Sequence, residues 1–340
     1  STDGEKKDAA GEKIAMITDS GDITDESFNQ ITWETVCAYG DANGVEYEYY
    51  KPAEDTDEER INSIDLAVSE GATVVVMPGY LFGPAIAEEQ DTYPDVTFIA
   101  VDVTEGDIVK NGKAVDLGKN VYICSFEEEQ AGYLAGYAAV KDGYTSLGFL
   151  GGIAVPAVIR FGYGYVQGIN AAAEEDGVDV NVKYYYGGQF YGDANITSRM
   201  EGWYSNGTQV VFACGGGIYT SAVEAALKNN GYVIGVDVDQ NYIGANGVAD
   251  GTYAYNPFIT SAMKGLTEAV NTALADIDAG SWGDIAGSNG NFGLEDGDYI
   301  GLPTDADSWN FESFTTDEYE ALNSKIKLSL IHLSEPTRPY

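Results

Sequence analysis

Short β-branched runs alternate with segments of helical periodicity along this chain, a pattern typical of parallel α/β sheets. In the first half, the apolar runs predict five strands, at Lys13–Thr18, Val45–Tyr50, Thr73–Met77, Val96–Val101 and Val121–Ser125. Between the first two strands, apolar residues recur every 3.6 positions and predict a helix, with Phe28, Ile31, Thr32, Thr35, Val36 and Tyr39 on one face.

The same pattern restarts after residue 125, with strands predicted in SLGFLGG, VNVKYYYGG, QVVFACGG and GYVIGVDVD. We therefore expect an α/β protein of two doubly wound parallel-sheet lobes. From about Gly251 the chain offers a long helix (Ser261–Asp278), a short strand near Asp298–Leu302 and a final helix near Asp317–Lys327. This remainder is too small for a third domain. It predicts an N-terminal lobe of residues 13–125 plus about 251–285, and a C-terminal lobe of 126–250 plus about 286–327.

The two ends of the chain differ from the rest in composition. Residues 1–12 are polar and rich in small side chains, which favours a flexible tether. Residues 328–340 resemble the translation of a sequencing adaptor and hold His332, the only histidine. We interpret 328–340 as a non-native tail and leave it out of the functional argument.

Composition narrows the class of ligand. The chain of 340 residues has a net charge of −38 and only four arginines, so it lacks the basic surface that nucleic acids require. The same field disfavours phosphorylated ligands, although acidity also serves solubility alone. Three cysteines stand in apolar surroundings and are expected to be buried thiols, and a single histidine makes a metal site unfavourable. We expect neither metal nor cofactor.

Three apolar strands end in an aspartate, at Asp19, Asp102 and Asp237. In open α/β sheets, ligands bind beyond the carboxyl ends of the strands. A single aspartate at such a place is most often a helix cap or a turn former. Three of them at matched positions in both halves favour a site for a polar ligand.

Five further residues are candidates, and several of them have a structural alternative. In the loop DSGDITDESFNQ, Asp25 or Ser27 is the expected N-cap, which places Phe28 and Asn29 in the first helical turn. Phe28 also begins the apolar face of that helix. Lys264 is either a snorkelling surface lysine near a helix start or a donor to the ligand. The turn with Gly215 and Gly216 lacks a phosphate-binding motif and instead allows a ligand to approach the backbone closely.

Several of these segments occur together in one known family. DSGDITDESFNQ, a strand ending in VD, SFEEEQAGYLAGYAA, the CGGG turn, IGVDVDQ and SAMKG follow in this order. Over roughly Lys13 to Lys327 the chain resembles the basic membrane protein family, nucleoside-binding lipoproteins that serve ABC transporters. The resemblance implies a type I periplasmic binding protein, with two Rossmann-like lobes, a multi-strand hinge and a ligand in the interlobe cleft.

The resemblance also implies roles for particular residues. Phe28 corresponds to the family's stacking aromatic with Asn29 beside it, Asp102 to the base-reading aspartate, Asp237 to the ribose-binding aspartate, and Lys264 to the family's lysine. The second stacking aromatic stays open among Phe161, Phe190, Trp203 and Tyr219. The loop Thr104–Asn120 and the CGGG turn depart from the family pattern.

The sequence therefore predicts a purine nucleoside receptor that works outside the cytoplasm, with an ABC permease as partner and a lipid anchor at its N-terminus. One alternative is the same fold binding a sugar, an autoinducer or an amino acid for uptake or signalling. A second is a nucleoside hydrolase that uses the aspartates as acid and base or to hold Ca²⁺. The loop residues Asp19, Ser20, Gly21 and Asp22 lack the spacing of an EF-hand, and we expect no catalysis.

Overall fold

The computed structural model describes residues 13–328, 331, 333 and 335, which fall into two units. Within the described residues, unit 1 comprises 13–125 and 266–291, and unit 2 comprises 126–265 and the residues from 292 onward. The chain thus passes from one unit to the other three times, at 125/126, 265/266 and 291/292. The predicted tether, 1–12, and most of the predicted tail, 328–340, lie outside the described residues.

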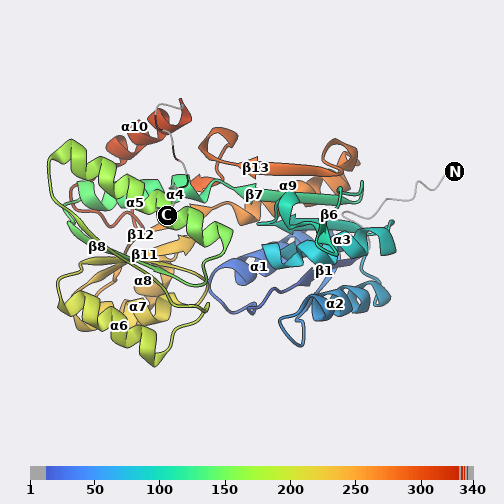
Figure 1. Ribbon diagram of the computed structural model, residues 1–340, viewed down its shortest axis with the longest axis horizontal. Coiled ribbons are helices and arrows are strands. Elements are labelled where there is room, and N and C mark those ends of the chain that lie inside the picture. The colour runs from blue at the N-terminus through green and yellow to red at the C-terminus, as the bar shows by residue number, and fades with distance from the viewer. Residues whose placement is uncertain (1–12, 329–330, 332, 334, 336–340) are drawn as a thin grey trace. The chain divides into compact units, whose positions relative to one another are not determined.

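Unit 1 is built on one six-stranded sheet in the order β13-β7-β4-β3-β1-β2. Figure 1 labels β13, β7 and β1 of this sheet. Its strands are β1 (Lys13–Ile17), β2 (Glu46–Tyr50), β3 (Val74–Pro78), β4 (Thr97–Val101), β7 (Val121–Phe126) and β13 (Ser288–Phe292). The pairings β2-β1-β3-β4-β7 are parallel. Five of these strands were predicted from the sequence to within one residue. Four of them, β1, β3, β4 and β7, are buried parallel strands and therefore nearly continuous apolar runs.

The helices of unit 1 cover both faces of this sheet. Ala15, Ile17, Val75 and Met77 face α2 (Asp57–Ser69) and α3 (Gly83–Thr92), whose apolar residues complete one core. On the opposite face α1 (Phe28–Asn43) packs against α9 (Leu266–Asp278). A small hairpin of β5 (Val109–Lys110) and β6 (Lys113–Ala114), with the 3-10 turn η2 (Glu105–Asp107), fills the loop after β4.

Unit 2 repeats this architecture with its sheet in the order β14-β12-β11-β10-β8-β9. The strands are β8 (Ser146–Gly151), β9 (Asn181–Tyr186), β10 (Val210–Cys214), β11 (Tyr232–Asp237), β12 (Phe258–Lys264) and β14 (Ile300–Gly301). All pairings are parallel except β12 with β14. Position by position, β1, β3 and β4 of unit 1 correspond to β8, β10 and β11 of unit 2. The predicted doubly wound α/β class is confirmed.

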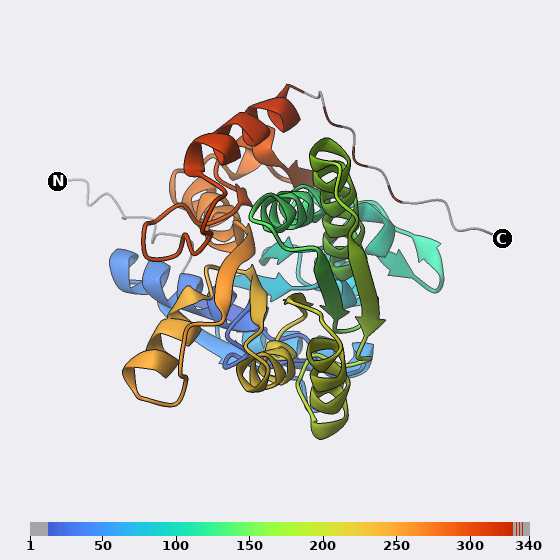
Figure 2. The same ribbon diagram turned by 90° about the vertical axis from the view of Figure 1, so that its left-hand side faces the viewer.

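Helices also cover both faces of the sheet of unit 2, as Figure 2 shows. On one side lie α4 (Glu128–Lys141) and α5 (Pro156–Asp176), on the other α6 (Ala194–Ser205) and α7 (Tyr219–Lys228). The helix α8 (Asn241–Ala249) contacts β12, and α10 (Thr316–Lys327) contacts α4.

Glycines set the distance between α4 and α5. A Cβ on Gly132 or Gly136 would lie 2.1 and 2.3 Å from carbonyl oxygens of α5, those of Phe161 and Tyr165. A Cβ on Gly164 would lie 2.0 Å from the carbonyl oxygen of Glu129 in α4. Glycine is therefore required on both helices, because any side chain would force the two backbones apart.

One predicted element is wrong, and it moves a domain boundary. The expected helix Ser261–Asp278 is the strand β12 up to Lys264, then Gly265, and a helix from Leu266. Ser261, Ala262 and Met263 pair in register with β11, so sheet pairing overrides the helical pattern. Residues 251–265 thus belong to unit 2 and not to the N-terminal lobe, whereas 286–291 belong to unit 1.

Candidate functional site

At the carboxyl edge of the sheet in unit 1, Asp19 is held by the first turn of α1. The Asn29 amide nitrogen donates to Asp19 Oδ1 at 2.8 Å and to Asp25 Oδ2 at 3.1 Å, and its oxygen accepts from the Asp19 backbone N–H. The Gly21 N–H also donates to Asp19 Oδ1, at 2.7 Å. Asn29 is buried and uses both amide hydrogens within the protein. Its place next to Asp19 is therefore well defined, whereas a direct contact with a ligand stays a prediction.

The N-terminus of α1 is capped by the carboxylate of Asp25. It accepts from the backbone N–H groups of Ser27, Asn29 and Gln30 at 2.9 to 3.0 Å. The residue at the N-cap position itself is Ser27. Both predicted candidates thus take part in the helix start, and Asp25 provides the side-chain cap that the exposed helical N–H groups need.

Burial changes the acidity of these carboxyl groups. It raises the pKa of Asp19 to about 6, against a partial lowering by the hydrogen bonds from Asn29 and Gly21, and the nearby charge of Asp25 adds to the rise. Burial likewise raises the pKa of Asp25, although three backbone N–H groups oppose the shift. Two carboxyl groups, those of Asp19 and Asp25, thus lie at this edge of the sheet, and their burial makes the ionised form of each less favourable.

Phe28 lies beside the same carboxylate. A Cβ placed on Gly79, directly after β3, would lie 3.4 Å from Asp19 Oδ2 and 3.6 Å from the Phe28 ring. Gly79 has φ 116°, which only glycine adopts without strain. The half-buried Phe28 ring and the Asp19 carboxylate thus flank a glycine turn, an arrangement that offers a flat apolar surface next to an acceptor.

Asp102 and Asp237 stand at corresponding strand ends in the two units. Asp102 follows β4 and Asp237 is the last residue of β11. Both adopt a left-handed backbone, with φ 58° and 67°. This conformation is uncommon outside glycine and costs free energy, so its presence at both ends is an indication of a functional constraint.

In unit 2, Lys264 is part of a buried network of charges. Its Nζ lies 3.4 Å from Glu128 Oε1 and 3.9 Å from Asp237 Oδ1. Arg160 Nε donates to Glu128 Oε2 at 2.6 Å. The expectation that Lys264 is a snorkelling surface lysine is wrong, because the residue is only 5% exposed. It ends strand β12 and lies two residues before the start of α9 at Leu266, so it is near a helix start as predicted.

Neither Glu128 nor Arg160 was predicted from the sequence as a site residue. Glu128 was placed within the family-like segment EEEQAGYLAG, but the three successive glutamates gave no reason to single it out. Arg160 is one of four arginines and stands in the apolar context VIRFGY, which was a usable signal. A lone cation in an apolar helix face needs a buried anion.

The glycine turn after β10 contacts another loop of the same unit. Gly215 has φ 150° and Gly216 has φ 49°. A Cβ on Gly215 would lie 2.9 Å from the backbone of Gly152 and 3.0 Å from the Phe190 ring. The glycine turn thus packs closely against Gly152 and Phe190, and the predicted approach of its backbone to a ligand stays a prediction.

Among the four candidates for a second stacking aromatic, Phe190 has the most suitable place. Phe161 is 1% exposed and packs on Phe212, and Trp203 fills the space beside Gly148. Tyr219 is packed against the core formed by α6 and α7. Phe190 is half-buried and covers the glycine turns that end β8 and β10.

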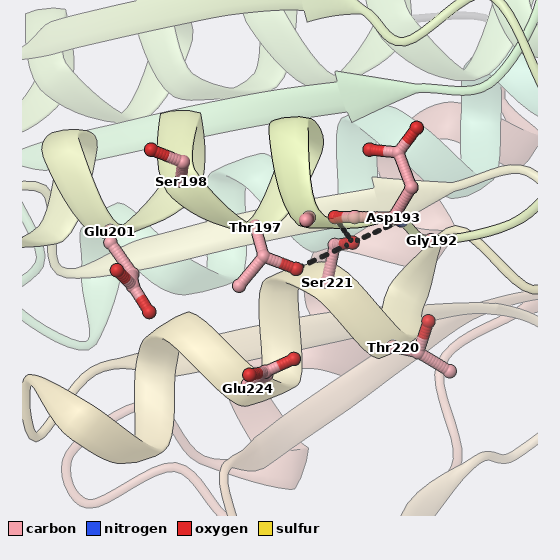
Figure 3. Close-up of a pocket in the computed structure, with 9 residues that line it drawn as sticks. Gly192, Asp193, Thr197, Ser198, Glu201, Thr220, Ser221 and Glu224 are labelled. Carbon is pink, nitrogen blue, oxygen red and sulfur yellow. Dashed lines mark hydrogen bonds between the residues drawn. The ribbon is translucent and has the colours of Figure 1, made fainter.

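A pocket of about 460 Å³ lies elsewhere in unit 2, between α6 and α7 (Figure 3). Its lining includes Asp193, Thr197, Glu201, Ser221 and Glu224, and none of the predicted site residues. The Ser221 hydroxyl accepts from the Asp193 backbone N–H and from Thr197, and donates to the Asp193 carbonyl oxygen. These polar groups are satisfied by one another, so the pocket does not define a ligand.

Two of the three cysteines are buried as predicted, Cys124 and Cys214, whereas Cys37 is half-buried. All three are described, and no disulfide joins them.

Within residues 13–328, each helix is either too short or too polar to cross a bilayer.

Known proteins share both the sequence pattern and the fold. The family model described as Bmp, ABC transporter substrate-binding protein PnrA-like, matches residues 12–335. The ABC transporter nucleoside-binding protein BmpA of Lactococcus lactis subsp. cremoris is 30% identical over 278 residues, 78% of this chain and 73% of that protein. The CD4+ T-cell-stimulating antigen of Listeria innocua is 30% identical over 318 residues, 90% of this chain and 84% of the antigen.

Among solved structures, an ABC transporter solute-binding protein of Aeropyrum pernix superposes with a TM-score of 0.77. It shares 20% identity and covers 96% of this chain and 94% of its own. The likeness shows the fold, which is that of type I periplasmic binding proteins.

Proposed function

Because this chain belongs to the Bmp family of PnrA-like ABC transporter substrate-binding proteins, we propose that it binds a purine nucleoside and delivers it unchanged to the permease of an ABC importer. The family is the extracytoplasmic solute-binding component of such transporters. The nucleoside, the site residues and the absence of catalysis are the parts that we propose.

The observation that carries the proposal is the matched pair of acidic strand ends, Asp102 and Asp237, which share a left-handed backbone conformation. In unit 2, Asp237 lies next to the ammonium group of Lys264. A carboxylate accepts two hydrogen bonds from a vicinal diol, and a neighbouring cation donates to a ring nitrogen or hydroxyl. We assign the ribose to Asp237 and Lys264 and the base to Asp102.

An aromatic residue in each unit favours the proposal that the ligand carries a flat base. Phe28 lies beside Asp19 and Gly79 in unit 1, and Phe190 covers Gly152 and Gly215 in unit 2. Stacking on an aromatic ring contributes about 1–3 kcal/mol per base. We propose that Phe28 and Phe190 both stack on the base, that Asn29 fixes Asp19 next to it, and that the Gly215–Gly216 turn lets the ligand approach.

Charge and relatives favour an uncharged nucleoside over a nucleotide. The chain carries a net charge of −38, which repels phosphate groups. The Lactococcus relative is named a nucleoside-binding protein. We also propose that the protein is held at the outer face of the cell membrane by an N-terminal lipid, which metabolic labelling of the full precursor with a radioactive fatty acid tests.

Calorimetry tests the ligand. Protein is unfolded in denaturant, dialysed to remove bound ligand and refolded, then titrated with inosine, adenosine and guanosine. We expect saturable heat with at least one of them, and none with arabinose or with the matching nucleoside monophosphate. Binding of a sugar and of no nucleoside would replace the proposal by its alternative. Release of free base during incubation with inosine would show a hydrolase.

Asp237→Ala tests the site. The loss of a buried acceptor for the diol is expected to weaken nucleoside binding by about 2–5 kcal/mol. The control is Asp250→Ala, an exposed aspartate of the same unit at the end of α8. An unchanged dissociation constant in the Asp237 variant would remove this residue from the site.

A further inference from the structure

Building on the proposed function, we infer that Glu128 is a positioning residue of the ligand site. It holds the ammonium group of Lys264 at a fixed distance from Asp237, and Arg160 holds Glu128. Glu128 is itself fully buried and does not touch the ligand. Its effect on binding passes through Lys264.

The geometry of the carboxylate supports this role. Glu128 is 0% exposed, and both of its oxygens are engaged by cations. Oε2 accepts from Arg160 Nε at 2.6 Å, whereas Oε1 lies 3.4 Å from both Arg160 and Lys264. A buried carboxylate is tolerated only with such compensation, and it in turn compensates both cations.

The position of Lys264 is also limited by two aromatic rings. Its Nζ lies 5.7 Å from the centre of the Phe126 ring and 5.5 Å from that of Phe161. The 3.9 Å from Nζ to Asp237 Oδ1 is longer than a hydrogen bond. Lys264 therefore neutralises Asp237 without making a direct hydrogen bond to that oxygen.

Removal of the negative charge at Glu128 changes the electrostatic attraction that acts on the Lys264 ammonium group. The attraction of Glu128 for Arg160 and Lys264 is lost, whereas the Asp237 carboxylate still lies 3.9 Å from the Lys264 ammonium group. The ammonium group then moves towards Asp237 and forms the hydrogen bond that the 3.9 Å distance now prevents. An Asp237 carboxylate paired in this way accepts less well from a diol, because its oxygen is already engaged.

The fold fixes the Glu128–Arg160 pair on two helices packed at minimal distance. Glu128 is the first residue of α4, where the helix N-terminus favours a negative charge, and Arg160 stands in the second turn of α5. The next turns bring Gly132 and Gly164 against the backbone of the facing helix. This contact leaves little freedom for either side chain to move relative to the other.

The test compares E128Q with E129Q at pH 8.5, because burial raises the pKa of Glu129 to about 7 and this carboxyl group of the same helical turn is ionised only above that value. Inosine and 2′-deoxyinosine are titrated into each variant. We expect E128Q to bind inosine about tenfold or more weakly, with a smaller loss for 2′-deoxyinosine, which offers no diol. E129Q is expected to stay within about twofold of the wild type. Equal losses for both ligands, or no loss in E128Q, would overturn the inference.

A double-variant comparison separates positioning from a general structural effect. If Glu128 acts through Lys264, then K264Q and the E128Q/K264Q double variant have the same affinity for inosine. A further loss in the double variant would show that Glu128 acts by another route. E128D keeps the charge and serves if E128Q does not fold; it is expected to bind between the wild type and K264Q, and wild-type affinity in E128D would count against the need for a fixed distance.

Failure of the proposed function is distinguishable from failure of this inference. A wild-type protein that binds neither inosine nor any other nucleoside contradicts the proposed function. A wild-type protein that binds inosine, together with an E128Q variant of equal affinity, contradicts only the role of Glu128.

Discussion

Asp102 and Asp237 occupy the same position in two sheets of identical strand order and share a left-handed backbone conformation. For a residue with a Cβ this conformation costs about 1–2 kcal/mol, less for aspartate and asparagine, whose short polar side chains bond to the local backbone. The same constraint in both units indicates that each strand end turns sharply there to present a carboxylate.

The backbone constraint predicts an order of stability at Asp102. Ala and Gly both remove the carboxylate, and only Ala keeps a Cβ, so Asp102→Gly is expected to be more stable than Asp102→Ala by about 1 kcal/mol. Urea denaturation of the two variants measures this difference. Asn at the same position is expected to lie near the wild type. An Ala variant more stable than the Gly variant would contradict a left-handed backbone at Asp102.

A pH-dependent prediction follows from Asp19. Burial raises its pKa from 3.8 to about 6 in the folded protein. The folded state therefore binds the proton more tightly than the unfolded chain, and the stability that this contributes is present below about pH 4 and lost as the pH rises through 6. Asp19→Asn removes the charge, so without ligand it is expected to be more stable than the wild type at pH 7.5, with the gain absent at pH 4.

The measurement for Asp19 is urea denaturation of ligand-free protein at both pH values. The comparison uses the difference between variant and wild type, which cancels the titration of the other carboxyl groups. The same difference at pH 4 and pH 7.5 would show that Asp19 titrates normally. At neutral pH the variant is also expected to bind nucleoside less well, since Asp19 is proposed to lie in the site.

Stacking by Phe190 gives a third prediction. Phe190→Ala is expected to weaken nucleoside binding by about 1–3 kcal/mol in calorimetry. The matched control is Tyr191→Ala, because the neighbouring Tyr191 is 63% exposed. Wild-type affinity in the Phe190 variant would contradict stacking by Phe190 and leave Phe161, Trp203 and Tyr219 as candidates for the second stacking aromatic.

The close packing of α4 against α5 gives a fourth prediction. In Gly164→Ala the new methyl group would lie 2.0 Å from the carbonyl oxygen of Glu129, so the helices must separate, at a cost of about 1–3 kcal/mol or more. Gly202→Ala is the control. Gly202 stands within α6 with no atom within 4 Å of an added Cβ, and there alanine is expected to stabilise by about 0.5–1 kcal/mol. Thermal unfolding measures both, and equal melting temperatures would contradict the close helix contact.

Much of the fold was predictable from sequence because its signals are local. The strands β1, β3, β4 and β7 of unit 1 are apolar runs, and the helix between the first two strands keeps a 3.6-residue period over several turns. The segment Phe258–Lys264 was not predictable in this way, because its few residues fit a strand or a helix and the choice is made by pairing with β11. Contacts with residues distant in sequence, those of β11, therefore decide between strand and helix.

The candidate site was predictable only in part, for a similar reason. Strand-end aspartates are visible in a sequence, since a charged residue follows an apolar run. Glu128, Arg160 and Lys264 are brought together from two helices and a strand, with up to 136 residues between them. Asn29 shows the same limit, because its sequence position suggested contact with a ligand and the structure shows an amide engaged by Asp19 and Asp25.

Because the chain crosses between the two units three times, the order in which the ribosome makes the residues affects when each unit can fold. Unit 1 takes α9 and β13 from residues 266–291, which leave the ribosome only after 126–265. Until then, the face of its sheet where α1 and α9 pack lacks one of its two helices. Unit 1 therefore cannot complete its fold before most of unit 2 has been synthesised, and the usual N-terminal-first sequence of domain folding does not apply. Nascent chains arrested shortly before residue 266 are expected to be sensitive to protease within residues 13–125.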